Sequence, residues 1–310
     1  MSIIEAQSLR KTYGDVVAVD EVSFAVEPGE IFGILGRNGA GKTTAVEMVS
    51  GLRRADSGSI VVDGLNPRTQ HKHVAQVLGV QLQESQLPDQ ITVAEALDMY
   101  AALYEDPVDW RSLADDLGLG PKLDTRYEKL SGGQKQRVSI ALALVGNPTV
   151  AILDELTTGL DPQARRDTWG LIETVRDRGV TIILVTHFME EAERLCDRIA
   201  VIHQGRVVAL DTPTGLIDRV AEGRKIQFRT ESPLDSSALT AVPDVTDVAV
   251  EGERIIVTGG DSVLFQLVGA LEALGVEPIE FAMERPTLDD AFLAFTGESF
   301  AADDEVTVPA

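Results

Sequence analysis

The chain has 310 residues, 44% of them hydrophobic and 25% charged, which is enough for one large core and a smaller domain. Its formal net charge of −23 opposes binding to nucleic acids through a general basic surface, so we expect no nucleic-acid partner. The single cysteine, Cys196, excludes an intrachain disulfide, and no apolar stretch approaches the roughly 20 residues that span a bilayer.

The first 65 residues predict strands separated by turns. Residues 3–14 and 16–30 have strand character, and the second stretch ends in the turn Pro28–Glu30. A buried strand over residues 30–36 precedes a glycine-rich turn and a helix from Lys42 onward, and residues 58–64 form another short strand. These amino-terminal strands favour an antiparallel, mixed β lobe.

The middle of the chain alternates helices with apolar strands. Helical patterns over residues 92–104 and 109–119 form an insert before the turn at Ser131. Strands are then predicted over residues 149–155 and 180–187 and a strand pair over 198–210, with helices over 134–145, 162–179 and 189–196. Alternation of this kind favours a mainly parallel sheet with helices on both faces.

A composition shift over residues 211–224 predicts a linker. Beyond it we expect strand, helix, hairpin, helix, strand and helix, which together make a small α+β domain with an antiparallel sheet. The expected domains are residues 1–219, with a helical subdomain over about 84–135, and residues 220–300. Residues 301–310 are expected to be a disordered tail.

The glycine-rich turn carries the first chemical motif. GRNGAGKT, residues 36–43, has the pattern glycine, four residues, glycine, lysine and threonine, between a strand and a helix. In this pattern backbone N–H groups and the helix amino terminus surround phosphates, Lys42 contacts the β- and γ-phosphates, and the Thr43 hydroxyl suits Mg²⁺. The sequence therefore predicts a site for ATP and Mg²⁺ formed by Gly36, Asn38, Gly39, Ala40, Gly41, Lys42, Thr43 and Thr44.

An acidic pair ends the apolar strand of residues 149–155. In phosphate-loop enzymes one acid at this place holds the metal ion and another residue orients or deprotonates the attacking water. Asp154 is therefore predicted to hold Mg²⁺ and Glu155 to act as the base. Alone, such a pair also fits a strand end that meets solvent, but the glycine loop upstream strengthens the catalytic interpretation.

A second glycine-containing turn lies at KLSGGQKQR, residues 129–137. Ser131 is a favourable N-cap, and Gly132 and Gly133 leave the helix amino terminus open to an anion. The segment predicts a second phosphate contact, and a capped helix with a glycine turn is the alternative.

The full set of motifs, over about residues 3–213, resembles the ATP-binding cassette (ABC) ATPases. The motifs follow the order of that family: TYG with Tyr13, GRNGAGKTT, QLQES with Gln83, LSGGQKQR, AILDE, GLDP with Asp161, and VTH with His187. The resemblance implies the phosphate-loop NTPase fold of an ABC cassette: a mixed β lobe, a parallel sheet core and a helical insert. Here a small C-terminal α+β domain would follow it.

The resemblance also implies roles for single residues at the nucleotide. Tyr13 would stack on adenine, and His187 would contact the γ-phosphate. Gln83 would contact Mg²⁺ and the attacking water, although Gln81 and Gln86 lie close to it in the sequence. The implied catalytic residues are thus Glu155, His187, Gln83 and Lys42, and the implied metal ligands are Thr43, Gln83 and Asp154.

In that family two cassettes pair head to tail. Ser131, Gly133 and Gln134 of one copy would reach the γ-phosphate held by the other, and Asp161 would lie at the interface. The chain has one set of motifs, so we expect a homodimer or a pairing with a homologous ABC subunit. One departure from the family is Leu156, which stands where proline is common and would loosen the following loop.

The carboxy-terminal segment ERPTLDDAFLAFTG, residues 284–297, resembles the end of ATPase subunits of ABC-2-type exporters, including those of daunorubicin/doxorubicin resistance. This resemblance implies an ATPase that powers efflux of a drug, antibiotic or lipid-like compound through a separate transmembrane permease. The chain would be cytoplasmic and peripheral at the membrane. A non-transport ABC ATPase of assembly or repair is the alternative.

Overall fold

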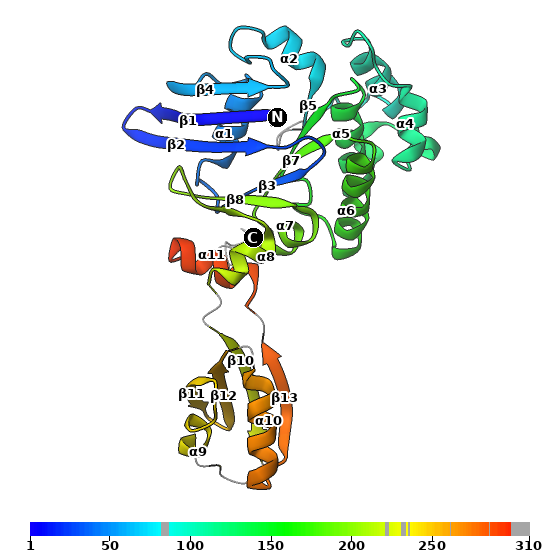
Figure 1. The fold of residues 1–310 in the computed structure, drawn as a ribbon. Helices are drawn as coiled ribbons and strands as arrows, with labels where there is room; N and C mark the ends of the chain where they lie inside the picture. The colour runs from blue at the N-terminus through cyan, green and yellow to red at the C-terminus, as the bar shows by residue number, and fades with distance from the viewer. Residues whose placement is uncertain are drawn as a thin grey trace. The chain divides into compact units, whose positions relative to one another are not determined.

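The computed structural model describes residues 1–81, 87–220, 223–230, 234, 236–260, 262–284 and 286–298 (Figure 1). The chain divides into two compact units, Met1–Pro213 and Thr214–Ala310. Gln83 and the expected tail of residues 301–310 lie outside the described residues, so their predictions stay predictions.

A six-stranded sheet forms the centre of the first unit. Its order is β5-β6-β7-β3-β8-β9, and neighbours run parallel except for β9, which is antiparallel to β8. Every residue of β3, β6 and β7 is buried, which explains why these strands are apolar runs rather than alternating patterns. The strands are β3 (Ile31–Leu35), β5 (Leu78–Gln81), β6 (Val150–Asp154), β7 (Thr181–Thr186), β8 (Arg198–His203) and β9 (Arg206–Asp211).

An antiparallel sheet makes the mixed lobe of the same unit, as predicted. It has the order β2-β1-β4 and consists of β1 (Ile4–Tyr13), β2 (Val16–Val26) and β4 (Ser57–Val62). Its buried face shares one apolar core with the larger sheet and with α1 (Lys42–Val49). The rings of Phe24 and Phe32 stack there with centroids 5.3 Å apart, which joins β2 to β3.

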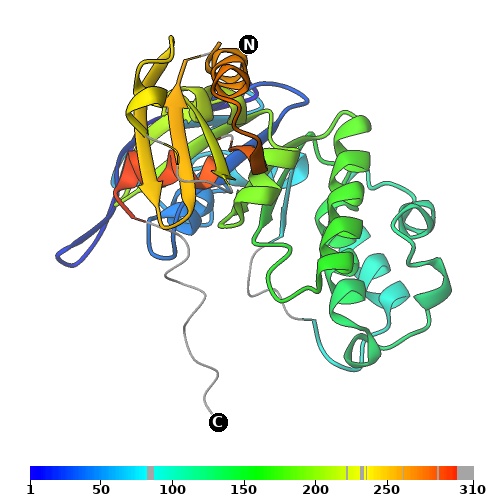
Figure 2. The ribbon, with the colours of Figure 1, turned by 90° about the horizontal axis from the view of Figure 1, so that it is seen from below.

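Helices coloured cyan to green lie to one side of the sheets of the first unit (Figure 2). The expected insert contains α3 (Val93–Ala101) and α4 (Trp110–Asp116), with short 3₁₀ turns at Gly120–Lys122 and Tyr127–Lys129, and α5 (Gly132–Leu144) follows it. A capping box of Thr92 and Glu95 starts α3, which satisfies two backbone N–H groups of its first turn. The remaining helices are α2 (His71–Val77), α6 (Pro162–Asp177) and α7 (Met189–Leu195).

The second unit contains an antiparallel four-stranded sheet of order β11-β12-β10-β13. One face of α10 packs with residues of β10 and β12 in a separate apolar cluster that includes Phe228, Val257 and Leu267. The segment predicted as a linker also contains a short helix, α8. The elements are α8 (Pro213–Asp218), β10 (Arg224–Thr230), α9 (Ser236–Thr240), β11 (Val245–Glu251), β12 (Arg254–Gly259), α10 (Val263–Leu274), β13 (Pro278–Glu284) and α11 (Leu288–Thr296).

The register of the large sheet aligns three strand ends. Leu35 pairs with Thr186, and Asp154 pairs with Val185. The carboxyl ends of β3, β6 and β7 therefore meet at one edge, where ligands bind in open α/β sheets.

Candidate active site

The glycine loop leaves the buried end of β3 and enters α1. Gly41 stands at the N-cap of α1 with φ of 103°, a conformation that favours glycine. A Cβ atom at this position would lie 2.2 Å from the carbonyl oxygen of Ala18, so no side chain fits. The loop thus needs glycine both for its backbone conformation and for its close contact with β2.

The Lys42 side chain folds back over this loop. Its Nζ donates to the carbonyl oxygens of Gly36 at 2.7 Å and Arg37 at 3.1 Å, and it lies 3.7 Å from Glu155 Oε1. Only 5% of the side chain is exposed. A buried ammonium group in this place suits an anion that approaches the helix amino terminus.

Asp154 ends β6 beside the loop and is almost fully buried. The Thr43 hydroxyl lies 3.5 Å from Asp154 Oδ2, and Gln81 Oε1 accepts the Asp154 backbone N–H at 3.1 Å. Burial, with the nearby Glu155 charge, raises the pKa of Asp154 to about 6. Asp154 Oδ1 has no hydrogen-bond partner among the described residues, so this carboxylate beside a threonine hydroxyl fits a hard cation such as Mg²⁺.

Glu155 follows in a left-handed backbone conformation, with φ of 49°. Its Oε1 atom lies 3.3 Å from His187 Nδ1, just beyond the end of β7. Contact with the His187 ring, aided by Lys42 and opposed by burial, holds the pKa of Glu155 below its ordinary value. The carboxylate is therefore ionised at neutral pH and can accept a proton.

Lys42, Thr43 and Glu155 line a cavity of about 320 Å³. Asp154 lies next to Thr43 and His187 next to Glu155, so the structure brings five of the predicted site residues together, and their roles stay predictions. Arg37 and Ala18 also line the cavity, although the motif alone did not indicate them. Its lining consists of Ala18, Arg37, Asn38, Gly39, Gly41, Lys42, Thr43, Thr44 and Glu155.

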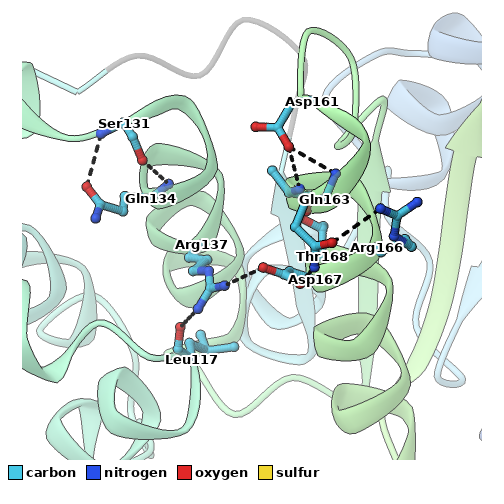
Figure 3. A network of polar contacts seen from close by, with 10 residues as sticks. Leu117, Ser131, Gln134, Arg137, Asp161, Gln163, Arg166, Asp167 and Thr168 are labelled. Carbon is cyan, nitrogen blue, oxygen red and sulfur yellow. Dashed lines mark hydrogen bonds and ion pairs between the residues drawn. The ribbon is translucent and has the colours of Figure 1, made fainter.

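Ser131, Gly133 and Gln134 lie elsewhere, at the amino terminus of α5, and do not line this cavity. Figure 3 shows the reciprocal pair in which Ser131 Oγ accepts from the Gln134 backbone N–H at 3.3 Å and Gln134 Oε1 accepts from the Ser131 N–H at 3.0 Å. Ser131 and Gly132 are exposed. The predicted cap is confirmed, and the helix end is open to solvent within one copy.

Asp161 caps the neighbouring helix α6. Its Oδ1 accepts from the backbone N–H groups of Gln163 and Ala164, both at 2.9 Å (Figure 3). Arg137 on α5 lies 3.8 Å from Asp167 on α6 and donates to the carbonyl oxygen of Leu117, at the end of α4, at 3.2 Å. Asp161 therefore has a structural role in the single chain, whatever its role at an interface.

Two further residues near the site were given no role in the sequence analysis, although Gln81 was noted there as a neighbour of Gln83. Gln81 supports Asp154 from β5, as described above. Glu191 on α7 is fully buried, accepts from Trp169 Nε1 on α6 at 3.0 Å, and has its pKa raised by burial. A signal for Glu191 existed, because its neighbours Ala192 and Leu195 mark that face of α7 as buried.

Leu156, the departure noted in the sequence, is 1% exposed. Its side chain is buried in the first unit, and Thr158 N–H donates to the Glu155 carbonyl oxygen at 3.3 Å in the same turn. The loop after the acidic pair is therefore anchored by an apolar side chain. Whether leucine loosens the loop relative to proline stays a prediction.

Replacing Asp154 with asparagine should raise the melting temperature of the nucleotide-free protein at neutral pH, since the change removes a buried charge beside Glu155. With a pKa of about 6 when folded against an ordinary 3.8, Asp154 costs stability as the pH rises through this range. The shift corresponds to at most about 3 kcal/mol. Thermal unfolding at a series of pH values checks this expectation. If Asp154→Asn raised the melting temperature by the same amount at pH 4 as at neutral pH, this expectation would be contradicted.

The fold and the geometry of the cavity define a phosphate-loop nucleoside triphosphatase. A family model described as ABC transporter matches residues 19–158. The Nod factor export ATP-binding protein I of Rhizobium etli is 36% identical over 302 residues, covering 96% of this chain and 94% of the relative. The protein of the same name from Burkholderia thailandensis is 38% identical, with coverage of 95% and 97%.

Solved structures agree with this assignment. One described as the ATP binding subunit of an ABC transporter is 27% identical with a TM-score of 0.64, and 70% of this chain matches 93% of it. The cbiO1 protein of Clostridium perfringens, part of the ABC transporter complex cbiONQ, is 29% identical with a TM-score of 0.64 and coverage of 71% and 94%. This chain belongs to the ABC transporter family as an ATP-binding subunit and is an ABC-type ATPase. Among its described residues, no helix combines the length and the apolar character required to cross a bilayer.

Proposed function

We propose that this chain is the ATP-hydrolysing subunit of an ABC-2-type exporter. The observation that carries the proposal is the meeting of the phosphate loop with Glu155 around one cavity, with Asp154 beside Thr43 and His187 beside Glu155. The relatives named for Nod factor export match the chain along almost its whole length, which supports export as the process that hydrolysis powers.

Each residue predicted for the site has a role in the proposed reaction. The phosphates of ATP replace the loop carbonyl oxygens as acceptors for Lys42, and Tyr13 stacks on the adenine. Thr43 and Asp154, with Gln83, hold Mg²⁺, which supplies charge neutralisation at the phosphates when bound. Glu155 accepts a proton from the attacking water. His187 orients Glu155 and contacts the γ-phosphate. The backbone groups of Gly36, Asn38, Gly39, Ala40, Gly41 and Thr44 surround the phosphates.

A second copy, or a homologous ABC subunit, completes the site. Ser131, Gly133 and Gln134 do not line the cavity of their own copy, and the helix end that carries them is exposed. In the proposed pair this helix end meets the γ-phosphate held by the opposite copy. Asp161 lies at the interface of the pair. ATP binding closes the two copies, and hydrolysis separates them.

The other parts of the chain couple this cycle to transport. Residues 1–219 form the ATP-binding domain, and the helical subdomain over about 84–135 transmits closure to a separate transmembrane permease. Residues 220–300 form an accessory domain. The likeness of residues 284–297 to daunorubicin/doxorubicin resistance ATPases supports a drug, antibiotic or lipid-like substrate. The chain would work at the cytoplasmic face of the membrane.

Co-expression with a candidate transmembrane permease tests this function. The chain should be recovered in the membrane fraction, co-purify with that protein in detergent, and hydrolyse ATP faster when an exported compound is added. Glu155→Gln in the same complex is the control for background hydrolysis. Hydrolysis that responds to DNA or ribosomes, without any membrane partner, would favour the non-transport alternative.

A further inference from the structure

Tyr13 is the last residue of β1, and its side chain is held by charged neighbours rather than by the core. The residue is 41% exposed. Two cations approach its ring: the Arg53 guanidinium carbon lies 5.2 Å and Lys11 Nζ lies 5.7 Å from the ring centroid. Contacts at these distances attract the cation to the ring electrons and reduce the rotation of an exposed aromatic side chain.

Arg53 is itself fixed to the helix that begins at the phosphate loop. Its Nε atom forms an ion pair with Glu47 on α1, and its backbone N–H donates to the Glu47 carbonyl oxygen at 2.9 Å. Lys42, the phosphate-loop lysine, starts the same helix. The Tyr13 ring is thus connected to the phosphate loop through two residues, Arg53 and Glu47.

Asp56 fixes the strand end from the other direction. Its carboxylate accepts from Lys11 Nζ at 2.8 Å and from the backbone N–H and hydroxyl of Thr12 at 2.7 and 2.8 Å. Its own backbone N–H donates to the Arg10 carbonyl oxygen at 2.9 Å. The contact with Lys11, followed by those with Thr12, lowers the pKa of Asp56 to about 2, so the carboxylate remains ionised at neutral pH.

We propose that Arg53 and Asp56 are positioning residues for the base of the nucleotide: they hold the Tyr13 ring at a fixed place relative to the phosphate loop. The inference rests on the proposed function, in which Tyr13 stacks on adenine. A ring that is already ordered loses less conformational entropy when the base binds. Its effect therefore concerns ATP binding and not the chemical step.

Arg53 and Asp56 act on ATP binding through the Tyr13 ring, without contact to the phosphates. Arg53→Gln and Asp56→Asn should each raise KM for ATP about three- to tenfold, in line with the loss of one cation–ring contact or its support. The value of kcat and the inhibition constant of tripolyphosphate, which has no base, should stay at the parental values. Arg53→Lys, which keeps the cation, should restore part of the affinity.

Arg54→Gln is the matched control. Arg54 and Arg53 both line a second cavity, which lies next to α1. Among the described residues, Arg53 contacts the Tyr13 ring but Arg54 does not. This variant should behave like the parental protein. Tyr13→Ala separates the inference from the proposed function, since it removes the base contact itself.

Three outcomes would overturn the inference. If Tyr13→Ala raises KM but Arg53→Gln and Asp56→Asn do not, Tyr13 contacts the base without their help. If KM and the tripolyphosphate inhibition constant rise together, the two residues support the phosphate loop rather than the base. If Tyr13→Ala leaves KM unchanged, the proposed stacking is wrong and the inference fails with it.

Discussion

Replacing Glu155 with glutamine should lower the rate of ATP hydrolysis by about 10²- to 10⁴-fold while the protein still binds ATP. Glutamine keeps the shape of the side chain but cannot accept a proton from water. Glu155 Oε1 is close to both His187 Nδ1 and Lys42 Nζ, so the variant loses a base that is already positioned and ionised. Removing its charge also reduces repulsion of the phosphates, so the affinity for ATP should be equal or higher.

Steady-state hydrolysis and equilibrium ATP binding, measured on the same preparation, check this prediction. Glu193→Gln, an exposed change on α7, is the control for a lost carboxylate outside the site. Hydrolysis by Glu155→Gln at the parental rate would show that another group is the base. Loss of ATP binding together with hydrolysis would instead mean that Glu155 supports the loop through Lys42.

Replacing Gly133 with aspartate should lower hydrolysis by about 10²- to 10³-fold without loss of thermal stability. A Cβ atom at Gly133 would lie 3.6 Å from the Ala164 Cβ atom, an ordinary contact, so the single chain can hold a side chain there. An aspartate in the first turn of α5 also favours the helix. The loss of rate would come from repulsion between the new carboxylate and the γ-phosphate on the opposite copy.

Gly133→Ala is the matched control, because it adds a side chain without a charge and should retain most of the activity.

A mixing experiment tests directly whether the site is shared between two copies. Lys42→Ala and Gly133→Asp should each be inactive alone, but a mixed pair contains one site with an intact phosphate loop facing an intact Gly133. Hydrolysis should therefore return on mixing. No recovery, or full activity of Gly133→Asp alone, would contradict a site shared between copies.

The sequence was most informative where one local pattern decides the structure. Strands β3, β6 and β7 are buried on both faces, so their apolar runs identified them, and the motifs at their ends located Lys42, Asp154 and His187. The cap at Ser131 was also local, since Ser131 and Gln134 are three residues apart. Capping boxes and phosphate loops depend on short spacings, and short spacings are visible in a single sequence.

The sequence was least informative where a structure depends on distant partners or on little burial. Helix α2 has one buried residue, Val74, and therefore no apolar periodicity to reveal it. Helix α8 likewise buries only Leu216 and begins at a proline, so its segment resembled a linker. The contacts of Arg53 and Asp56 with the end of β1 join residues about 40 positions apart, which no local pattern shows.

The pairing of Leu35 with Thr186 and of Asp154 with Val185 affects which amino-acid substitutions this protein can accept during evolution. Peptide hydrogen bonds between strands, rather than particular apolar side chains, set the spacing of the lysine loop, the acidic pair and the histidine. Exchanges such as isoleucine for valine within β3, β6 or β7 should cost about 0.5 to 1.5 kcal/mol of stability and leave the reacting groups in place. The strands can therefore diverge widely among descendants while the catalytic geometry is inherited unchanged.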